Sequence, residues 1–554
     1  MNNLSNKFSI ILKSNFYKLF FFSYFCTGII IFKDYGISID EEFHRFSGFY
    51  WLDYVLSFFN FEILNNVVSF KLSEINGFTL PNPKDNLSYG VVFDLPLALI
   101  ETIFNFKTYK DIFFLRHFAN FLIFFIGSIY FYKILSNRFK NNFIIFCGLL
   151  FYIISPRIFG HSFYNNKDII LLSFITISIF YYFKTIDNFN LKNILCFSFF
   201  SALACSTRVV AIFIPLSFLL FYFFSLLNKK TNKDQNLQII FYIIFFIFFT
   251  ILTWPYLWNN PVNNFINSIK FFSKHYLTIQ MLFNGQYIHS NTLPFKYLPV
   301  WIFITVPIMN LTFFLFGFFY YLKRSLLRMI NIKPISIYED FWRGNKEKKD
   351  FFIFFNFFII FIYLALSNVI LYTGWRQVYF LHFFLAYMST FGLYLILNIA
   401  KSQKIKFLTI ALVVIFLFVN IIDLIRFHPY QSLYFNSILT KEQKNSFEID
   451  YWGISGVKFL KKILTLEKNN NNKINVATAS FLPLERSLKL LDENDSLKIN
   501  IVGQEYNKAD YIFDNNISEV NKFLNRKYEI PKNFNKIDEF KIDNIIIYKI
   551  YKKF

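Results

Sequence analysis

Cysteine is scarce in this chain, and so are the spacings that usually mark a metal site. Only four cysteines occur among 554 residues, all lie in or beside apolar stretches, and none follows Cys205. Their spacing excludes a cysteine-based metal site, and a disulfide framework in the later part of the chain is excluded as well. The first apolar stretch also lacks a small-residue cleavage site after it, so we expect it to be a retained membrane span.

Acidic residues are in the minority, but this does not indicate a nucleic-acid partner. Lys and Arg number 57 against 35 Asp and Glu, which gives a net charge of +22. A basic patch is the usual footprint of nucleic-acid binding, yet here the excess lies mainly in loops between apolar runs. The 84 phenylalanines, together with abundant Ile, Asn and Lys, indicate biased nucleotide composition, so we expect no nucleic-acid partner.

Long apolar runs dominate the chain. Apolar residues make up 55% of it, and the mean hydropathy is +0.39. A helix needs roughly 20 apolar residues to cross the hydrocarbon core of a bilayer. About eleven runs approach that length, which predicts an α-helical polytopic membrane protein in contact with membrane lipid. The expected spans are residues 10–32, 115–135, 142–154, 168–183, 191–205, 209–227, 237–257, 297–322, 351–372, 378–399 and 407–425.

The distribution of positive charge predicts the orientation. Lys and Arg accumulate in loops that stay in the cytoplasm. With Lys7, Lys13 and Lys18 inside, every second connection is Lys-rich, beginning with Lys133, Arg138 and Lys140. An odd number of spans then leaves the tail from about residue 426 on the outer side of the membrane.

The sequence therefore divides into three parts. Residues 1–426 form the expected membrane domain, with outer segments at 33–111, where we expect interfacial helices, and at 258–296. Residues 427–472 form a junction that ends in the linker run Asn469–Asn472. Residues 473–554 predict a small extracytoplasmic α/β domain with strands at 473–478, 498–502 and 510–513, a helix at 482–491, and a strand or hairpin arm at 540–549.

A carboxylate cluster directly follows the first span. Asp40, Glu41 and Glu42 precede His44 and Arg45, and Glu41, His44 and Arg45 could share one face of a helix. In the simplest alternative, Asp40 caps this helix and the glutamates favour the positive end of its dipole.

Further charged groups recur at the mouths of spans on the same expected face. They are Arg157, His161, Lys167, Asp168, Arg208 and Arg376, with Asp94 as a weaker candidate in the first outer segment. A single Arg at the end of a span usually reaches toward lipid headgroups. Repeated acids and arginines on one face instead indicate a functional site for an anionic, lipid-borne substrate.

In the order and sidedness of these motifs the chain resembles the polytopic GT-C glycosyltransferases, in particular protein O-mannosyltransferases and bacterial lipid A aminoarabinose transferases. The resemblance rests on the acidic pair after the first span, the Ser155-Pro156 loop that ends at Asp168, Thr207-Arg208, and Arg376 before the tenth span. His428-Pro429-Tyr430-Gln431 and Asp450-Tyr451-Trp452-Gly453 are similar to motifs of one bacterial branch.

The resemblance implies a sugar donor carried on a polyprenyl phosphate and transfer at the outer face of the bacterial inner membrane. The acceptor is a protein, a lipid or another glycan. A carboxylate can deprotonate an acceptor hydroxyl, and arginines suit a leaving phosphate. We therefore expect Asp40 to be the base, with Glu41 and Asp168 as its partners. For the donor phosphate we expect Arg208, Arg376, Lys167 and Arg157, and for other substrate contacts Glu42, His44, Arg45, His161 and Asp94.

Three alternatives remain open at this point. A divalent metal ion could be held by these carboxylates with His44 and His161, although hydrogen-bonded polar groups without metal explain the same residues. A secondary transporter is the main rival function, but it would favour internal repeats, and none is obvious here. An O-antigen polymerase or ligase is the nearest rival among enzymes.

Overall fold

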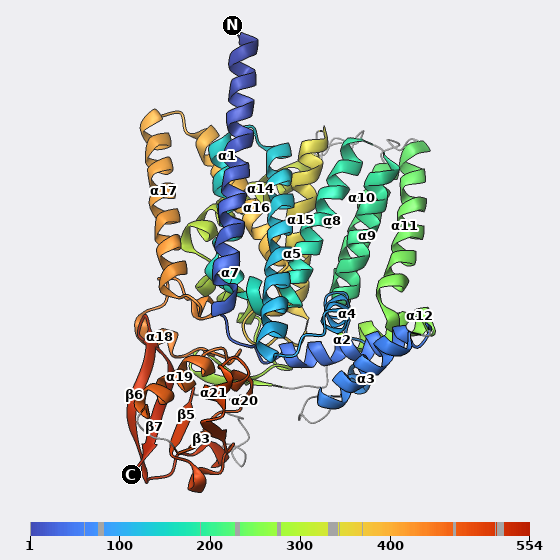
Figure 1. Ribbon diagram of the computed structural model, residues 1–554. Coiled ribbons are helices and arrows are strands. Elements are labelled where there is room, and N and C mark those ends of the chain that lie inside the picture. The colour runs from blue at the N-terminus through green and yellow to red at the C-terminus, as the bar shows by residue number, and fades with distance from the viewer. Residues whose placement is uncertain are drawn as a thin grey trace.

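The computed structural model describes residues 2–59, 61–75, 82–188, 190–227, 233–273, 279–330, 342, 344–367, 369–468, 472–515, 517 and 526–554. Long helices form a bundle between two faces (Figure 1), with the N-terminus at one face and a small sheet domain at the other. Of the expected linker run, Asn469, Asn470 and Asn471 lie outside the described residues.

Eight helical segments of the described residues are long and apolar enough to cross a membrane. They belong to α1 (Asn2–Ile31), α5 (Tyr109–Arg138), α8 (Asp168–Asp187), α10 (Phe213–Leu227, with η3, Val209–Ile212), α11 (Lys233–Thr253), α15 (Gly344–Leu366), α16 (Leu381–Ile399) and α17 (Gln403–Arg426). A ninth arises if α6 (Asn142–Ile153) and α7 (Pro156–Tyr164), bent by 57°, count as one broken span.

The expected number of about eleven spans is therefore not confirmed, although helix covers most of each predicted run. Helix α9 (Leu191–Thr207) has only 17 residues. The run at 297–322 is divided into α13 (Tyr297–Thr305) and α14 (Ile308–Ile330), because Pro307 between them cannot donate a backbone hydrogen bond. Figure 1 shows α9 and α14 within the bundle beside the longer helices.

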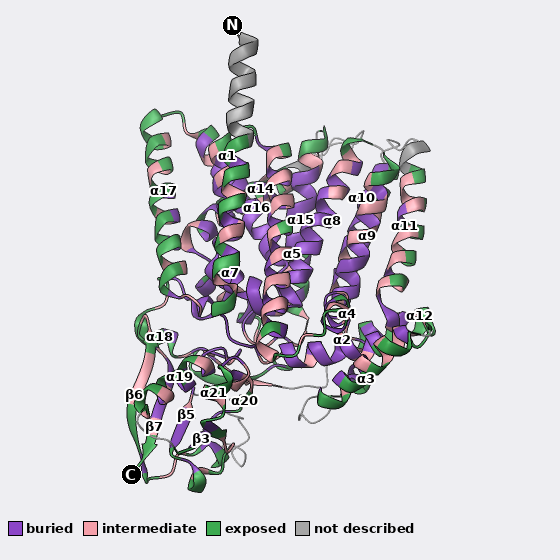
Figure 2. Ribbon diagram, viewed as in Figure 1, coloured by how far each residue is buried: buried purple, intermediate pink, exposed green. Residues whose placement is uncertain are grey.

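Burial separates inner helices from outer ones. In the apolar stretch of α8, 83% of the residues are buried, and in that of α16, 78%. The corresponding share is 17% in α1, α11 and α17 (Figure 2), which expose large apolar side chains such as Ile30, Phe248 and Phe418. An apolar outer surface of this kind suits contact with lipid.

Three short helices fill the first outer segment. Helices α2 (Glu41–Leu56), α3 (Glu62–Ile75) and α4 (Asp94–Ile103) pack around a small core that includes Phe49 and Val68. Together with α12 (Pro261–Ser273), α2 and α3 lie across the lower end of the bundle rather than along it (Figure 1). The hairpin β1 (Gln280–Phe283) and β2 (Gln286–His289) completes the second outer segment.

The C-terminal domain is a five-stranded mixed sheet in the order β4-β3-β5-β7-β6. Strand β3 (Ile474–Thr478) is parallel to β4 (Ile499–Ile501) and β5 (Tyr511–Asp514), whereas β7 (Ile545–Lys553) runs antiparallel to β5 and β6 (Phe534–Ile542). Helix α19 (Gly456–Leu466) packs on the sheet through Phe459, whose ring contacts Phe513 and Tyr548.

The predicted fold class, a polytopic helical membrane protein with a small C-terminal α/β domain, is confirmed. The predicted helix at 482–491 is wrong in extent, because only α20 (Glu485–Leu488) forms after Pro483. The closing strand or hairpin arm predicted at 540–549 is wrong in extent, because this run contains the turn between β6 and β7. Asp543 and Asn544 turn the chain there with φ of +50° and +63°, as a tight hairpin turn requires. The other short elements are η1 (Phe32–Asp34), η2 (Pro83–Asn86), η4 (Pro255–Leu257), η5 (Arg376–Val378), η6 (Gln431–Leu433), α18 (Lys441–Lys444), α21 (Glu493–Ser496), η7 (Tyr506–Lys508) and η8 (Arg526–Tyr528).

Candidate functional site

Asp40 and Arg376, which are 336 positions apart in the chain, form an ion pair. Arg376 Nη1 lies 2.7 Å from Asp40 Oδ2. Asp40 occupies the N-cap position of α2, but its side chain makes no capping hydrogen bond, so the alternative of a simple helix cap is not what the structure shows. The Asp40 side chain is 32% exposed and that of Arg376 only 3%. Asp40 is therefore an accessible carboxylate fixed by a buried cation.

Aromatic rings hold the guanidinium of Arg376 in place. Its centre lies 4.6 Å from the ring of Tyr372, 5.3 Å from Tyr451 and 4.7 Å from Trp452. Cations are attracted to the faces of such rings, most strongly where water is excluded. Arg376 Nε is buried and has no hydrogen-bond partner in the described part of the chain, which leaves one donor unused.

A second acid and cation pair comes from the ends of two inner helices. Asp168 begins α8, and Arg208 directly follows α9. Arg208 Nη2 lies 2.7 Å from Asp168 Oδ1, and Asn165 Nδ2 donates to the other oxygen at 2.9 Å. The Arg208 side chain is 20% exposed, and its Nε also lacks a hydrogen-bond partner among the described residues. Two of the three arginines predicted to bind phosphate, Arg208 and Arg376, thus keep an unused N–H group.

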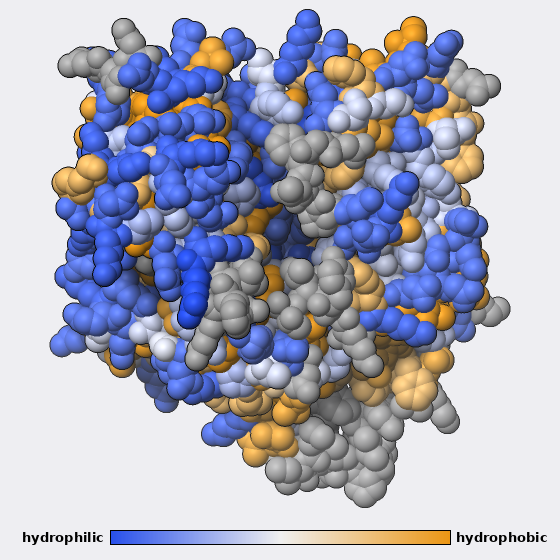
Figure 3. Space-filling model, turned by 90° about the horizontal axis from the view of Figure 1, so that it is seen from below, coloured by the Kyte–Doolittle hydropathy of each residue, from blue (hydrophilic) through white to orange (hydrophobic). Residues whose placement is uncertain are grey.

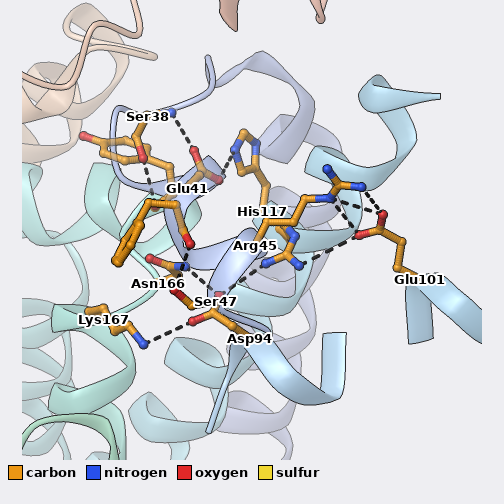
Figure 4. A network of polar contacts seen from close by, with 12 residues as sticks. Ser38, Glu41, Arg45, Ser47, Asp94, Glu101, His117, Asn166 and Lys167 are labelled. Atoms are coloured by element: carbon orange, nitrogen blue, oxygen red, sulfur yellow. Dashed lines mark hydrogen bonds and ion pairs between the residues drawn. The ribbon is translucent and has the colours of Figure 1, made fainter. Parts of the chain in front are cut away.

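Asp94 is the centre of a buried network (Figure 4). It is the first residue of α4 and is fully buried. Arg116 Nη1 lies 3.2 Å from Asp94 Oδ1, and Asn166 Nδ2 donates to the same oxygen at 2.9 Å. Lys167 Nζ lies 3.1 Å from Asp94 Oδ2 and also donates to the carbonyl of Gly90. Lys167, predicted to bind phosphate, is therefore already engaged by a carboxylate.

Glu41 and Arg45 join this network through different partners. Glu41 accepts from the backbone N–H of Ser38 at 2.6 Å and lies 2.9 Å from His117 Nε2. Arg45 Nε donates to both carboxylate oxygens of Glu101, at 3.2 and 3.1 Å. Glu41 and Arg45 have no common partner among the described residues. The face of α2 that they were expected to share therefore mainly connects α2 to α5, through His117, and to α4, through Glu101.

His44 lies where the cations of the site converge. Burial, followed by the positive charges of Lys167, Arg208 and Arg376, lowers the pKa of His44 well below its ordinary value. The imidazole is therefore neutral at physiological pH. Its Nδ1 is buried without a hydrogen-bond partner in the described residues, so it can offer one nitrogen to a bound group.

Two predicted residues, Arg157 and His161, line a small cavity. Arg157 Nε donates to the carbonyl of Tyr434 at 2.8 Å, and the guanidinium lies 4.7 Å from the ring of Phe435. His161 Nε2 lies 3.3 Å from the hydroxyl of Tyr379. Both residues line a small polar cavity together with Glu448. Arg157 is already held by a carbonyl and aromatic rings, which makes it a weaker phosphate ligand than Arg208.

Sequence reasoning missed Glu101, Arg116, His117 and Glu448. The first three stand at the ends of α4 and α5, where a charged residue after or within an apolar run was the only signal. Glu448 lies two residues before the Asp450-Tyr451-Trp452-Gly453 motif, and that proximity was the signal that could have marked it. The last candidate, Glu42, faces away from the network and accepts from Arg486 Nε at 2.9 Å.

A metal site finds no support among these residues. Within the described ranges, no group of three or more His, Cys, Asp or Glu side chains is placed to hold a metal ion. The carboxylates are instead paired with Arg, Lys or His.

The face that carries the C-terminal domain is hollowed near its centre, and hydrophilic atoms lie within the hollow (Figure 3).

Glu448 and Asp450 give the junction a predicted pH dependence. Burial raises the pKa of Glu448 to about 8, against the opposing charges of Arg376 and Arg157. Burial also raises the pKa of Asp450 to about 7, opposed by the hydrogen bond that Ser455 donates. The folded protein thus retains protons that an unfolded chain releases near pH 4, so stability should fall as pH rises from about 5 to about 8.

Glu448→Gln should reduce the fall in the free energy of unfolding with rising pH by up to about 1.4 kcal/mol per pH unit, because one titrating proton is removed. Thermal unfolding midpoints of the purified protein between pH 5 and pH 9 measure the effect. Asp450→Asn provides the matched comparison. An unaltered slope in Glu448→Gln would contradict the assignment.

Comparison with known proteins adds one family match. Residues 92–254 match the family described as Dolichyl-phosphate-mannose-protein mannosyltransferase. This match confirms the resemblance to membrane glycosyltransferases, and the matched segment contains Asp94, Lys167, Asp168 and Arg208. Among curated proteins, no sequence matches.

Two solved structures of ArnT from Cupriavidus metallidurans are also similar. The structure bound to undecaprenyl phosphate is 10% identical, with a TM-score of 0.38, and the alignment covers 78% of this chain and 84% of that one. The apo structure is 10% identical, with a TM-score of 0.41, and the alignment covers 84% of this chain and 87% of that one.

Proposed function

We propose, from the premise that residues 92–254 carry the pattern of the dolichyl-phosphate-mannose-protein mannosyltransferase family, that this protein is a membrane glycosyltransferase. It transfers a sugar from a polyprenyl-phosphate donor to an acceptor hydroxyl on a protein, lipid or glycan. The observation that carries the proposal is the exposed Asp40 carboxylate, held 2.7 Å from buried Arg376.

The reaction follows from the charges around Asp40. The acceptor oxygen attacks the anomeric carbon, its proton passes to Asp40, and the bond between that carbon and the phosphate oxygen breaks. Direct displacement inverts the anomeric configuration. A positioned carboxylate is a suitable general base, and the leaving polyprenyl phosphate acquires negative charge that cations stabilise.

Arg208 and Arg376 suit the leaving phosphate because each has an unused, buried Nε–H donor among the described residues. A buried donor without a partner costs free energy, and a phosphate oxygen would satisfy it with a charge-assisted hydrogen bond. Asp168 orients Arg208. The positive charge of Lys167 is balanced by Asp94, so the two arginines are the phosphate ligands of the proposal. Glu41 fixes the first turn of α2.

The proposal places the reaction on the outer side of the bacterial inner membrane. The site residues of α2 lie at the end of the bundle that carries the C-terminal domain (Figure 1). The Lys-rich connections predict the opposite end to be cytoplasmic. A lipid-borne donor can approach from the bilayer between the spans.

A transfer assay tests the proposal. We expect the purified protein in lipid nanodiscs to release polyprenyl phosphate and form a glycosylated product when given radiolabelled polyprenyl-phosphate sugars and a panel of hydroxyl acceptors. Neither product should form with nucleotide sugars alone. Uptake of labelled substrate into sealed vesicles with no covalent product would overturn the proposal in favour of a transporter.

A further inference from the structure

The C-terminal domain reaches the first turn of α2 through two cations. Arg486 Nε donates to Glu42 at 2.9 Å, and Arg486 Nη1 donates to the backbone carbonyl of Ile39 at 2.6 Å. Lys489 Nζ donates to the other oxygen of Glu42. All three charged side chains are largely buried. Arg486 therefore contacts a residue on each side of Asp40.

A backbone contact from the junction supports the same turn. The N–H of Ile39 donates to the carbonyl of Trp452 at 3.1 Å. At Gly36 a side chain would not fit, since a Cβ atom there would lie 2.5 Å from the carbonyl oxygen of Ile454. Trp452 also covers the guanidinium of Arg376. Both members of the Asp40–Arg376 pair are therefore held from the C-terminal side.

The neighbouring glutamates fix α2 from opposite directions. Glu41 is bound to His117 of the membrane domain, whereas Glu42 is bound to the C-terminal domain. Burial lowers the pKa of Lys489, and the charge of Glu42 opposes that shift. Loss of Arg486 would leave the carbonyl of Ile39 without this donor and free the turn that carries Asp40.

We propose that Arg486 and Lys489 are positioning residues that hold Asp40 in line with Arg376, so that the C-terminal domain completes the active site. This inference rests on the proposed function of Asp40. It gives the domain a role in catalysis that does not require it to touch the substrate.

Arg486→Gln should lower kcat by about 10²-fold, the size expected when a catalytic group is displaced by about 1 Å. The KM for the polyprenyl-phosphate sugar should change less than about twofold, because the phosphate ligands are untouched. Arg486→Lys should restore part of the activity, since a lysine can satisfy one of the two acceptors.

The matched control breaks another contact of the same domain. Lys110 Nζ lies 2.8 Å from Asp492 Oδ1, which joins α5 to the C-terminal domain at an exposed position without contact to Glu42 or Ile39. Asp492→Asn should leave kcat within about twofold, as exposed ion pairs contribute little. Equal losses of kcat in Asp492→Asn and Arg486→Gln would overturn the proposal, because general loosening of the domain would then explain both.

A readout independent of activity separates this inference from the proposed function. In Asp40→Cys protein, the rate of maleimide labelling at position 40, followed by peptide mass spectrometry, should rise when Arg486→Gln is added and remain constant with Asp492→Asn. If the protein with Asp40 intact transfers no sugar while Arg486→Gln still speeds the labelling of Asp40→Cys protein, the proposed function is refuted and the positioning role is kept. Unchanged labelling would refute the positioning role.

Discussion

Asp40→Asn is expected to lower kcat for sugar transfer by about 10²- to 10⁴-fold, the range that a general base contributes. Asparagine keeps the size of the side chain and can still accept a hydrogen bond from Arg376, but it cannot take the proton of the acceptor hydroxyl. The KM for the donor should change little. Steady-state transfer rates with a saturating polyprenyl-phosphate sugar measure the effect.

Asp53→Asn is the matched control for this substitution. Asp53 lies on the same helix α2 and is exposed, so the same chemical change should leave transfer within about twofold of wild type. Asp40→Glu should keep measurable activity, because it retains a carboxylate at a displaced position. A normal rate in Asp40→Asn would remove Asp40 from the role of base.

The fold was largely predictable because long apolar runs have few alternatives in a membrane. The run at 168–183 corresponds to α8, which begins at Asp168 and continues to Asp187. The division at Pro307 was not predictable, since a proline within an apolar run is tolerated when neighbouring helices satisfy the freed backbone group. The short helix α20 after Pro483 has four residues where the pattern predicted a helix over 482–491.

The sequence marked candidate residues, but it did not show how their charges pair. Charges at the mouths of spans marked Asp40, Asp168, Arg208 and Arg376, and the structure brings each acid to a cation. No sequence pattern showed that Glu41 would meet His117 while Glu42 met Arg486. Adjacent residues on a helix point in directions about 100° apart. One turn of α2 can therefore contact the membrane domain through Glu41 and the C-terminal domain through Glu42.

Arg376→Ala is expected to lower kcat/KM for the polyprenyl-phosphate sugar by about 10²- to 10³-fold, the usual loss when a preorganised donor to a developing anion is removed. The guanidinium is held by Asp40 and three rings, so it needs little reorganisation as charge develops on the leaving phosphate. The effect should be larger for donor kinetics than for the KM of the acceptor. Initial rates at varied donor and varied acceptor separate the two.

Arg376→Lys distinguishes the shape of the cation from its charge. A lysine keeps the positive charge but lacks the planar fork that stacks on rings and donates to Asp40 and a phosphate together, so its activity should fall between those of wild type and Arg376→Ala. Arg426→Ala, which removes a half-exposed arginine paired with Asp543 in the C-terminal domain, is the matched control and should leave donor kinetics within about twofold. A loss confined to acceptor use in Arg376→Ala would contradict the phosphate-binding role, because in the proposed reaction Arg376 stabilises the leaving phosphate of the donor.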